Sequence, residues 1–271
     1  DNGPKYGLFD PPSKDVLKFV DDIRWTDLDY LRTGKSDTLT LRVSGTDDQV
    51  TMVDFLEEII FLGYVNALET IAFADGTEWS YLQLLQHFVD VGQTGGNDII
   101  YGFEGIADIF YVGAGNDRLE GLSGNDIYYF AQGSGNDTIF DEEGADRLIF
   151  ANLNFSDVAI TRTALDLVFT IKATGERLIV EGQYIREGLQ HAAVELFVFG
   201  DRLVSFTDLN PEDIALDRFT GGATSGADTL TGSDFGEIID GRGGDDELIG
   251  ADGGDTYIFD VGYGNDVIVD R

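Results

Sequence analysis

The sequence predicts an all-β protein in which blocks of parallel β-helix alternate with small β-rich modules. Three observations support this fold class. A short motif rich in glycine and aspartate recurs in two blocks, the segments before each block alternate apolar and polar residues, and a longer pattern repeats along the chain. The 35 Gly and 4 Pro follow no collagen period, so tight turns are the expected use of the glycines.

The charge of the chain narrows the range of partners. The 271 residues include 17 basic and 51 acidic side chains, which gives a net charge of −34 at pH 7. Because a polyphosphate needs a basic face, this balance argues against nucleic-acid binding and against docking on an anionic membrane. The absence of Cys excludes disulfides and thiolate chemistry, and no apolar run approaches the ~18 residues of a membrane span. The many carboxylates must therefore stay solvated or meet cations.

The short motif is Gly-Asn-Asp or a close variant, followed within two or three residues by a large apolar residue. Complete nonapeptides begin at Gly121, Gly241 and Gly250. The motif stands at 96–98, 115–117, 124–126, 135–137 and 264–266, with variants at 226–228, 244–246 and 253–255. This repetition is the signature of a Ca²⁺-binding parallel β-helix.

The residue types of the nonapeptide explain the signature. Glycine permits the left-handed backbone of a tight turn, and the turn offers main-chain carbonyls together with the carboxylate of the sixth-position Asp. Oxygen ligands in a flexible cage suit Ca²⁺ and exclude soft metals. The eighth-position residues are expected to point between the two sheets; they are Ile100, Leu119, Tyr128, Ile139, Leu248, Tyr257 and Ile268.

A longer repeat organises the chain into alternating modules. The segment Asp15-Val-Leu-Lys-Phe19 matches Asp146-Arg-Leu-Ile-Phe150, 131 positions later. The fragment therefore reads as two units of a longer array. We expect a remnant of a preceding roll at 1–14, β-rich capping modules at 15–90 and 147–219, and β-rolls at 91–146 and 220–271.

Within the capping modules, alternating residues predict strands at 38–43, 50–53, 165–171 and 177–180. The dipeptide Asp75-Gly76 predicts a hairpin between 71–73 and 77–79. Segments 53–62 and 80–89 fit short helices, with Ser80 as a cap, although the same apolar runs fit buried strands as well.

On its nonapeptides, the chain resembles the RTX (repeats-in-toxin) family of secreted bacterial proteins. Its other modules resemble the haemolysin-type calcium-binding-related domain through Asp-x-Leu-x-Phe at 146–150 and Phe73-Ala-Asp-Gly-Thr77. The resemblance implies a right-handed parallel β-roll. It also implies export of the unfolded chain through a type I secretion apparatus, and folding when the chain meets extracellular Ca²⁺.

The family's ligation pattern combines carbonyls and the Asp of one turn with those of the turn stacked on the same edge. Carried over residue by residue, it implies several Ca²⁺ ions, about three to four per roll. In the first roll the implied ligands are Gly96, Asp98, Asp108, Gly113, Ala114, Gly115, Asp117, Gly121, Ser123, Gly124, Asp126, Ser134, Asp137 and Asp146. In the second roll they are Thr224, Gly226, Asp228, Gly241, Gly243, Gly244, Asp246, Gly250, Asp252, Asp255 and Asp266.

The expected function is that of a calcium-binding structural and secretion module in a larger extracellular or cell-surface protein, such as an adhesin or toxin. We expect no catalytic site, because His87 and His191 do not occupy matching positions and most carboxylates belong to the repeats. Trp25 and Trp79 are expected in a module core. Two alternatives stay open: an adhesin module that binds a glycan or cell surface, and the RTX part of a secreted polysaccharide-modifying enzyme.

Overall fold

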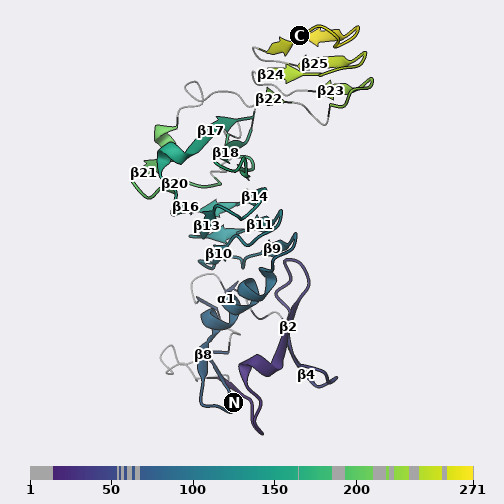
Figure 1. Ribbon diagram of the computed structural model, residues 1–271. Helices are drawn as coiled ribbons and strands as arrows, with labels where there is room; N and C mark the ends of the chain where they lie inside the picture. The colour runs from purple at the N-terminus through teal and green to yellow at the C-terminus, as the bar shows by residue number, and fades with distance from the viewer. Residues whose placement is uncertain are drawn as a thin grey trace, which may run out of the picture. The chain divides into compact units, whose positions relative to one another are not determined.

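The computed structural model describes residues 15–53, 55, 58–59, 63–64, 68–163, 165–184, 193–209, 218–219, 223–231, 238–251 and 255–270. The chain divides into two compact units, Asp1–Gly92 and Gln93–Arg271. Strands dominate both units, and most strands of the second unit stack in parallel sheets (Figure 1). The all-β fold class with a parallel β-roll is therefore confirmed.

The first unit contains two small sheets. An antiparallel meander follows the 3-10 turn Trp25–Asp27 and consists of β2 (Leu28–Arg32), β3 (Leu39–Val43) and β4 (Gln49–Met52). The other sheet consists of β1 (Val16–Lys18), β7 (Thr70–Ala72) and β8 (Glu78–Ser80). Strands β3 and β4 confirm the predictions at 38–43 and 50–53. Strands β7 and β8 pair antiparallel around Asp75-Gly76, as the hairpin prediction requires.

The one α-helix of the described chain, α1, spans Tyr81–Gly92 and confirms the prediction at 80–89. Ser80 caps it, because its hydroxyl oxygen accepts from the Gln83 backbone N–H at 3.3 Å. One face is buried through Leu84, Leu85, Phe88 and Val89.

The helix expected at 53–62 is wrong where the structure describes it. Glu58–Ile59 form strand β5, which pairs antiparallel with β6 (Gly63–Tyr64), so the alternative of a strand holds there. Residues 54, 56–57 and 60–62 lie outside the described residues. The apolar run fits both structures, and pairing with β6 decides between them.

The aromatic residues of the first unit pack together. The rings of Trp25 and Trp79 lie 5.6 Å apart, and the His87 ring stands 4.8 Å from that of Trp79. Burial lowers the pKa of His87. These contacts place both tryptophans in the packed part of the unit.

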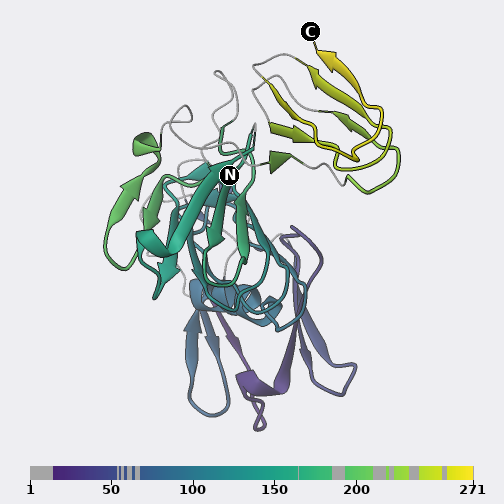
Figure 2. The same ribbon diagram turned by 45° about the horizontal axis from the view of Figure 1, so that its top comes forward.

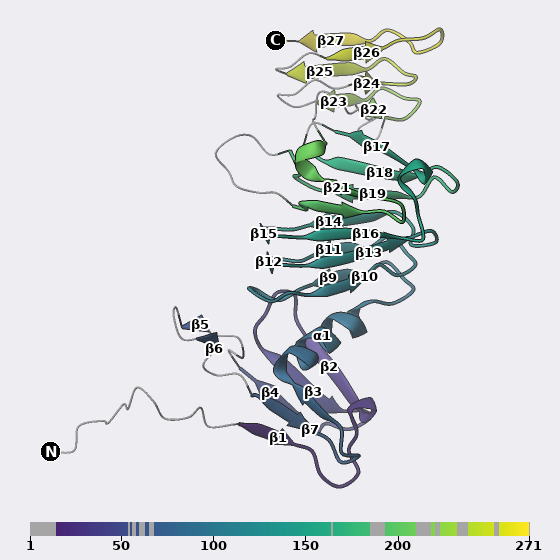
Figure 3. The same cartoon turned by 90° about the vertical axis from the view of Figure 1, so that its left-hand side faces the viewer.

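The first roll consists of two parallel sheets in consecutive layers (Figure 3). One sheet contains β9 (Ile99–Tyr101), β11 (Arg118–Glu120) and β14 (Asp137–Phe140). The other contains β10 (Ile109–Tyr111), β13 (Ile127–Ala131) and β16 (Arg147–Ala151). The parallel registers stack the eighth-position residues, so that Ile100, Leu119, Tyr128 and Ile139 are buried at 3% exposure or less.

Strands from residues 155–209 extend both sheets of this roll. Strand β19 (Arg177–Val180) pairs in parallel with β14, and β20 (Leu196–Val198) pairs in parallel with β16. Antiparallel strands β17 (Val158–Arg162), β18 (Leu167–Ile171) and β21 (Leu203–Ser205) complete the sheets; β18 and β19 lie in the segments expected as strands. The segment expected as a capping module thus shares its hydrogen bonding with the roll.

The described strands between residues 218 and 270 form a two-sheet stack of their own, drawn in yellow-green to yellow (Figure 2). One sheet contains β22 (Arg218–Phe219), β24 (Ile238–Asp240) and β26 (Thr256–Ile258). The other contains β23 (Thr229–Thr231), β25 (Glu247–Ala251) and β27 (Val267–Asp270). The buried core is small and consists of Ala223, Leu230, Ile239 and Leu248, with Tyr257 packed against it.

One expected inward residue of this stack is not buried. Ile268 is 52% exposed, because β27 is the outermost strand of its sheet among the described residues.

Candidate metal centre

The sixth-position aspartates of the first roll form two ladders, one on each edge. On the Asp117 edge, Asp117 Oδ1 accepts from the Asp98 backbone N–H at 2.9 Å, and Asp137 Oδ1 accepts from the Asp117 N–H at 2.8 Å. On the Asp126 edge, Asp126 Oδ1 accepts from the Asp108 N–H at 2.8 Å, and Asp146 Oδ1 from the Asp126 N–H at 2.7 Å. Each carboxylate is therefore held against the turn stacked before it.

The second roll repeats this geometry. Asp246 Oδ1 accepts from the Asp228 N–H at 2.9 Å, and Asp266 Oδ1 accepts from the Asp246 N–H at 3.0 Å. Gly250, in β25, lies close to the Asp255 carboxylate, whereas Asp252 is outside the described residues.

In two of the ladders, the first aspartate makes hydrogen bonds that the later aspartates do not make. The Asp228 Oδ2 atom accepts from the backbone N–H of Thr224 at 2.7 Å and from its hydroxyl at 2.9 Å. Thr94 makes the same two contacts with Asp98 Oδ2, each at 2.7 Å. In Asp98 and Asp228, the Oδ2 atom is therefore hydrogen-bonded within its own turn.

The later aspartates of the ladders each have a carboxylate oxygen that could bind a cation. One oxygen of each of these carboxylates is buried and accepts no hydrogen bond from any described residue: Asp117 Oδ2, Asp126 Oδ2, Asp137 Oδ2, Asp146 Oδ2, Asp246 Oδ2 and Asp266 Oδ2. A buried charged oxygen without a partner is destabilising by several kcal/mol unless a cation or proton neutralises it. The arrangement therefore fits a bound cation.

The electrostatics of the Asp126 edge support the same conclusion. Burial raises the pKa of Asp126 to about 9, and repulsion from Asp141, Asp108 and Asp146 adds to the shift. Burial raises the pKa of Asp146 to about 6, and that of Asp137 on the other edge to about 7. Burial therefore disfavours the charged form of all three carboxylates, and a bound cation would stabilise it.

The turns stack too closely for side chains on their inner positions. Gly135 has φ +103°, and a Cβ there would overlap the carbonyl oxygen of Gly115. Gly264 has φ +108° and the same relation to the Gly244 carbonyl. Main-chain oxygens consequently lie beside the carboxylates, which makes the set of donors entirely oxygen and suitable for Ca²⁺.

The remaining expected ligands are main-chain groups of the turns that carry these ladders. On the Asp117 edge they are Gly96, Gly113, Ala114, Gly115 and Ser134, on the Asp126 edge Gly121, Ser123 and Gly124, and in the second roll Thr224, Gly226, Gly241, Gly243 and Gly244.

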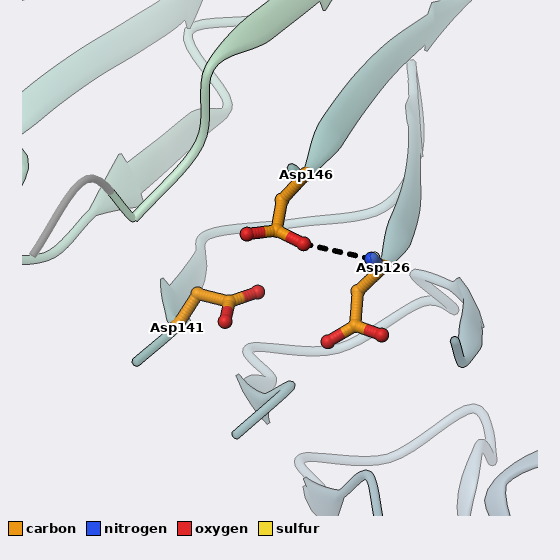
Figure 4. A group of neighbouring side chains, drawn as sticks. All are labelled: Asp126, Asp141 and Asp146. Atoms are coloured by element: carbon orange, nitrogen blue, oxygen red, sulfur yellow. Dashed lines mark hydrogen bonds between the residues drawn. The ribbon is translucent and has the colours of Figure 1, made fainter. Parts of the chain in front are cut away.

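Sequence reasoning missed one acidic residue of the site, Asp141. Oxygens of Asp126, Asp141 and Asp146 lie within 4.8 Å of one another, and all three residues are buried (Figure 4). Asp141 Oδ2 accepts from the Tyr128 hydroxyl at 2.6 Å, and burial raises its pKa to about 8. Asp141 occupies the first position of its nonapeptide, where glycine is expected. The signal available was Asp270, which stands at the matching position of the second roll.

Comparison with protein families agrees with the geometry. The RTX calcium-binding nonapeptide repeat matches residues 106–134, 133–152 and 217–257. The chain carries RTX calcium-binding repeats. The haemolysin-type calcium-binding protein related domain matches residues 39–83, which confirms the second resemblance. The RTX repeats bind calcium, so the expected cofactor is the cation that the ladders fit.

Comparison with individual proteins is less informative. None of the curated proteins matches the chain. One similar solved structure is the extracellular lipase LipA from Serratia marcescens, with 18% identity and a TM-score of 0.28 over 65% of this chain and 26% of the lipase. This RTX chain spans about a quarter of the lipase's length. Among the described residues, no helix is long and apolar enough to span a membrane.

Proposed function

We propose that this RTX chain is a calcium-dependent structural module of a larger secreted protein, which folds outside the cell when Ca²⁺ fills the ladders. The observation that carries the proposal is the row of buried carboxylate oxygens without hydrogen-bond donors on successive turns. In the proposed sites, the sixth-position aspartates and the turn carbonyls are the ligands, including the main-chain groups expected from the family pattern.

The charges explain why the metal would control folding. Residues 93–146 contain 11 acidic side chains and one basic side chain, Arg118. Layers of a sheet lie about 4.8 Å apart, and two unit charges at about 5 Å repel by roughly 3 kcal/mol at an effective dielectric of about 20. The second roll stacks its aspartates in the same way, and its small buried core cannot offset several such repulsions. Metal binding would therefore supply folding free energy.

The magnitude is sufficient at extracellular calcium concentrations. With Ca²⁺ tenfold above a site's dissociation constant, each site adds about 1.4 kcal/mol to the stability. Three or four sites then supply about 4–6 kcal/mol, which is comparable to the stability of a whole domain.

The same dependence suits export. An unfolded acidic chain is a suitable substrate for a type I secretion apparatus, and RTX repeats are typical of secreted proteins. We therefore propose an extracellular or cell-surface location and a structural, non-enzymatic role, in which the carboxylates serve metal binding and not acid–base chemistry.

Equilibrium dialysis tests this proposal by counting bound ions. We expect several Ca²⁺ ions per chain at 1 mM, retained in excess Mg²⁺, because the larger ion tolerates the irregular oxygen cage. Binding of no Ca²⁺, or equal binding of Mg²⁺, would refute it.

A further inference from the structure

The ladder on the Asp126 edge continues beyond the nonapeptides. Glu195 Oε2 accepts from the Asp146 backbone N–H at 2.6 Å, the contact that a sixth-position Asp makes with the turn before it. The next residue, Leu196, pairs with Arg147 in the parallel register of β20 and β16. Glu195 therefore stands where the next ladder aspartate would stand, although it follows Asp146 by 49 residues.

The first unit contains the same arrangement. Glu69 Oε2 accepts from the Asp15 N–H at 2.6 Å, and Thr70 pairs with Val16 in the parallel register of β7 and β1. Asp15 matches Asp146 in the long sequence repeat. In each unit, a glutamate therefore accepts a hydrogen bond from the backbone N–H of the matching aspartate, although Asp15 and Glu69 are exposed whereas Asp146 is buried.

The backbone around Glu195 is firmly held. The buried Gln183 side chain donates to the Val194 carbonyl at 2.8 Å and accepts from the Val194 N–H at 3.0 Å. The Phe206 N–H donates to the Glu195 carbonyl at 2.8 Å, and the Leu196 N–H to the Asp146 carbonyl at 3.2 Å. The carboxylate of Glu195 is consequently directed at Asp146 by rigid elements, as a ligand position requires.

The groups that face Glu195 are buried acids with spare oxygens. Asp146 is 0% exposed and Asp141 is 2% exposed. Asp146 Oδ2 and Asp141 Oδ1 accept no hydrogen bond from any described residue. A third acid beside two such groups destabilises the site unless a cation lies among them.

The Asp117 edge supplies a contrast. There the register opposes Asp137 with Leu178, which has no charge, and Asn136 Oδ1 accepts from the Arg177 N–H at 3.0 Å. A following strand can thus continue the sheet without an acid in the ladder. The glutamate on the Asp126 edge is therefore not a general requirement of strand pairing.

We propose that Glu195 and Asp146 form a terminal Ca²⁺ site next to the group of Asp126, Asp141 and Asp146, in which a glutamate from outside the nonapeptides replaces the next ladder aspartate. The site rests on the proposed calcium function and adds a consequence to it: Ca²⁺ bound there would strengthen the attachment of β20 to the roll, beyond the backbone pairing of β20 with β16.

The substitution Glu195→Gln in the full chain tests this site. Glutamine keeps an oxygen for the Asp146 N–H and removes the charge, so a structural cap survives and a charged ligand is lost. We expect dialysis to count one Ca²⁺ fewer per chain, or one site weakened at least tenfold. In EDTA we expect an equal or higher melting temperature, because a repulsive charge is gone. Glu247→Gln, the same change at an exposed position of β25, is the matched control and should leave both readouts unchanged.

The outcomes separate the two proposals. If the wild-type chain binds no Ca²⁺, the proposed function fails. If the wild-type chain binds Ca²⁺ and Glu195→Gln binds the same number of ions with the same affinity, the terminal site fails and the nonapeptide sites stand. Should Glu195→Gln not fold, Glu195→Asp keeps the charge on a side chain one methylene shorter, and an unchanged affinity of every Ca²⁺ site in that variant overturns the proposal.

Discussion

Removing Asp246 should damage the second roll more than removing Asp228. Asp246 is 2% exposed, lies between Asp228 and Asp266 in the ladder, and has a buried oxygen without a donor among the described residues. Asp228 is the first rung, and Thr224 already saturates its Oδ2 atom. Asp246 is thus placed to serve two stacked sites, and Asp228 only one.

The magnitude follows from the number of sites lost. With Ca²⁺ tenfold above the site constant, Asp246→Ala removes about 2.8 kcal/mol from two sites, and Asp228→Ala removes about 1.4 kcal/mol from one. The difference is about tenfold in the folding equilibrium. In EDTA the order reverses, because alanine at 246 removes an uncompensated buried charge.

Urea unfolding of both variants in Ca²⁺ and in EDTA measures these differences. The wild type under each condition is the reference, and Asp228→Ala controls for the loss of one acid from the same ladder. Equal losses of stability in Ca²⁺, or the same order of the two variants in EDTA, would refute the shared-ligand scheme.

Two further predictions concern pH and the turns. Burial raises the folded-state pKa of Asp126 from 3.8 to about 9 and that of Asp141 from 3.8 to about 8. At pH values between 3.8 and these raised values, the calcium-free fold therefore binds more protons than the unfolded chain. Its melting temperature in EDTA should therefore fall from pH 5 to pH 8, and a rise would contradict the burial argument. Gly135→Ala should be destabilising by at least about 3 kcal/mol in urea unfolding, because its Cβ meets the Gly115 carbonyl. Gly133→Ala, with similar φ and open space, should lose only about 1 kcal/mol, and equal losses would refute close stacking.

The repeats made the roll predictable from sequence. Each Gly-Asn-Asp fixes a turn, and the apolar residue two positions later fixes which side chains face inward, as Leu119 and Ile139 show. The sixth-position aspartates could be paired for the same reason, because their spacing follows the layers. The structure brings Asp98, Asp117 and Asp137 together on one edge, and Asp108, Asp126 and Asp146 on the other.

Features that depend on the pairing of distant strands could not be predicted from the sequence. The run around Glu58–Ile59 is apolar in a way that fits helix or strand, and only its pairing with β6 decides. Glu195 joins the ladder after an interval that no repeat predicts, because the register of β20 against β16 brings it there. Asp141 was missed because it occupies a glycine position, where the motif gives no reason to expect a carboxylate.

The most direct test of the account is a Ca²⁺ titration of the chain followed by far-UV circular dichroism and thermal unfolding. The buried carboxylates of both rolls predict that EDTA removes much of the β signal and lowers the melting temperature. Millimolar Ca²⁺ should restore both in a cooperative transition, whereas Mg²⁺ at the same concentration should not. If the EDTA-treated and Ca²⁺-loaded chains have the same spectrum and the same melting temperature, the metal does not hold the rolls together, and the central claim is wrong.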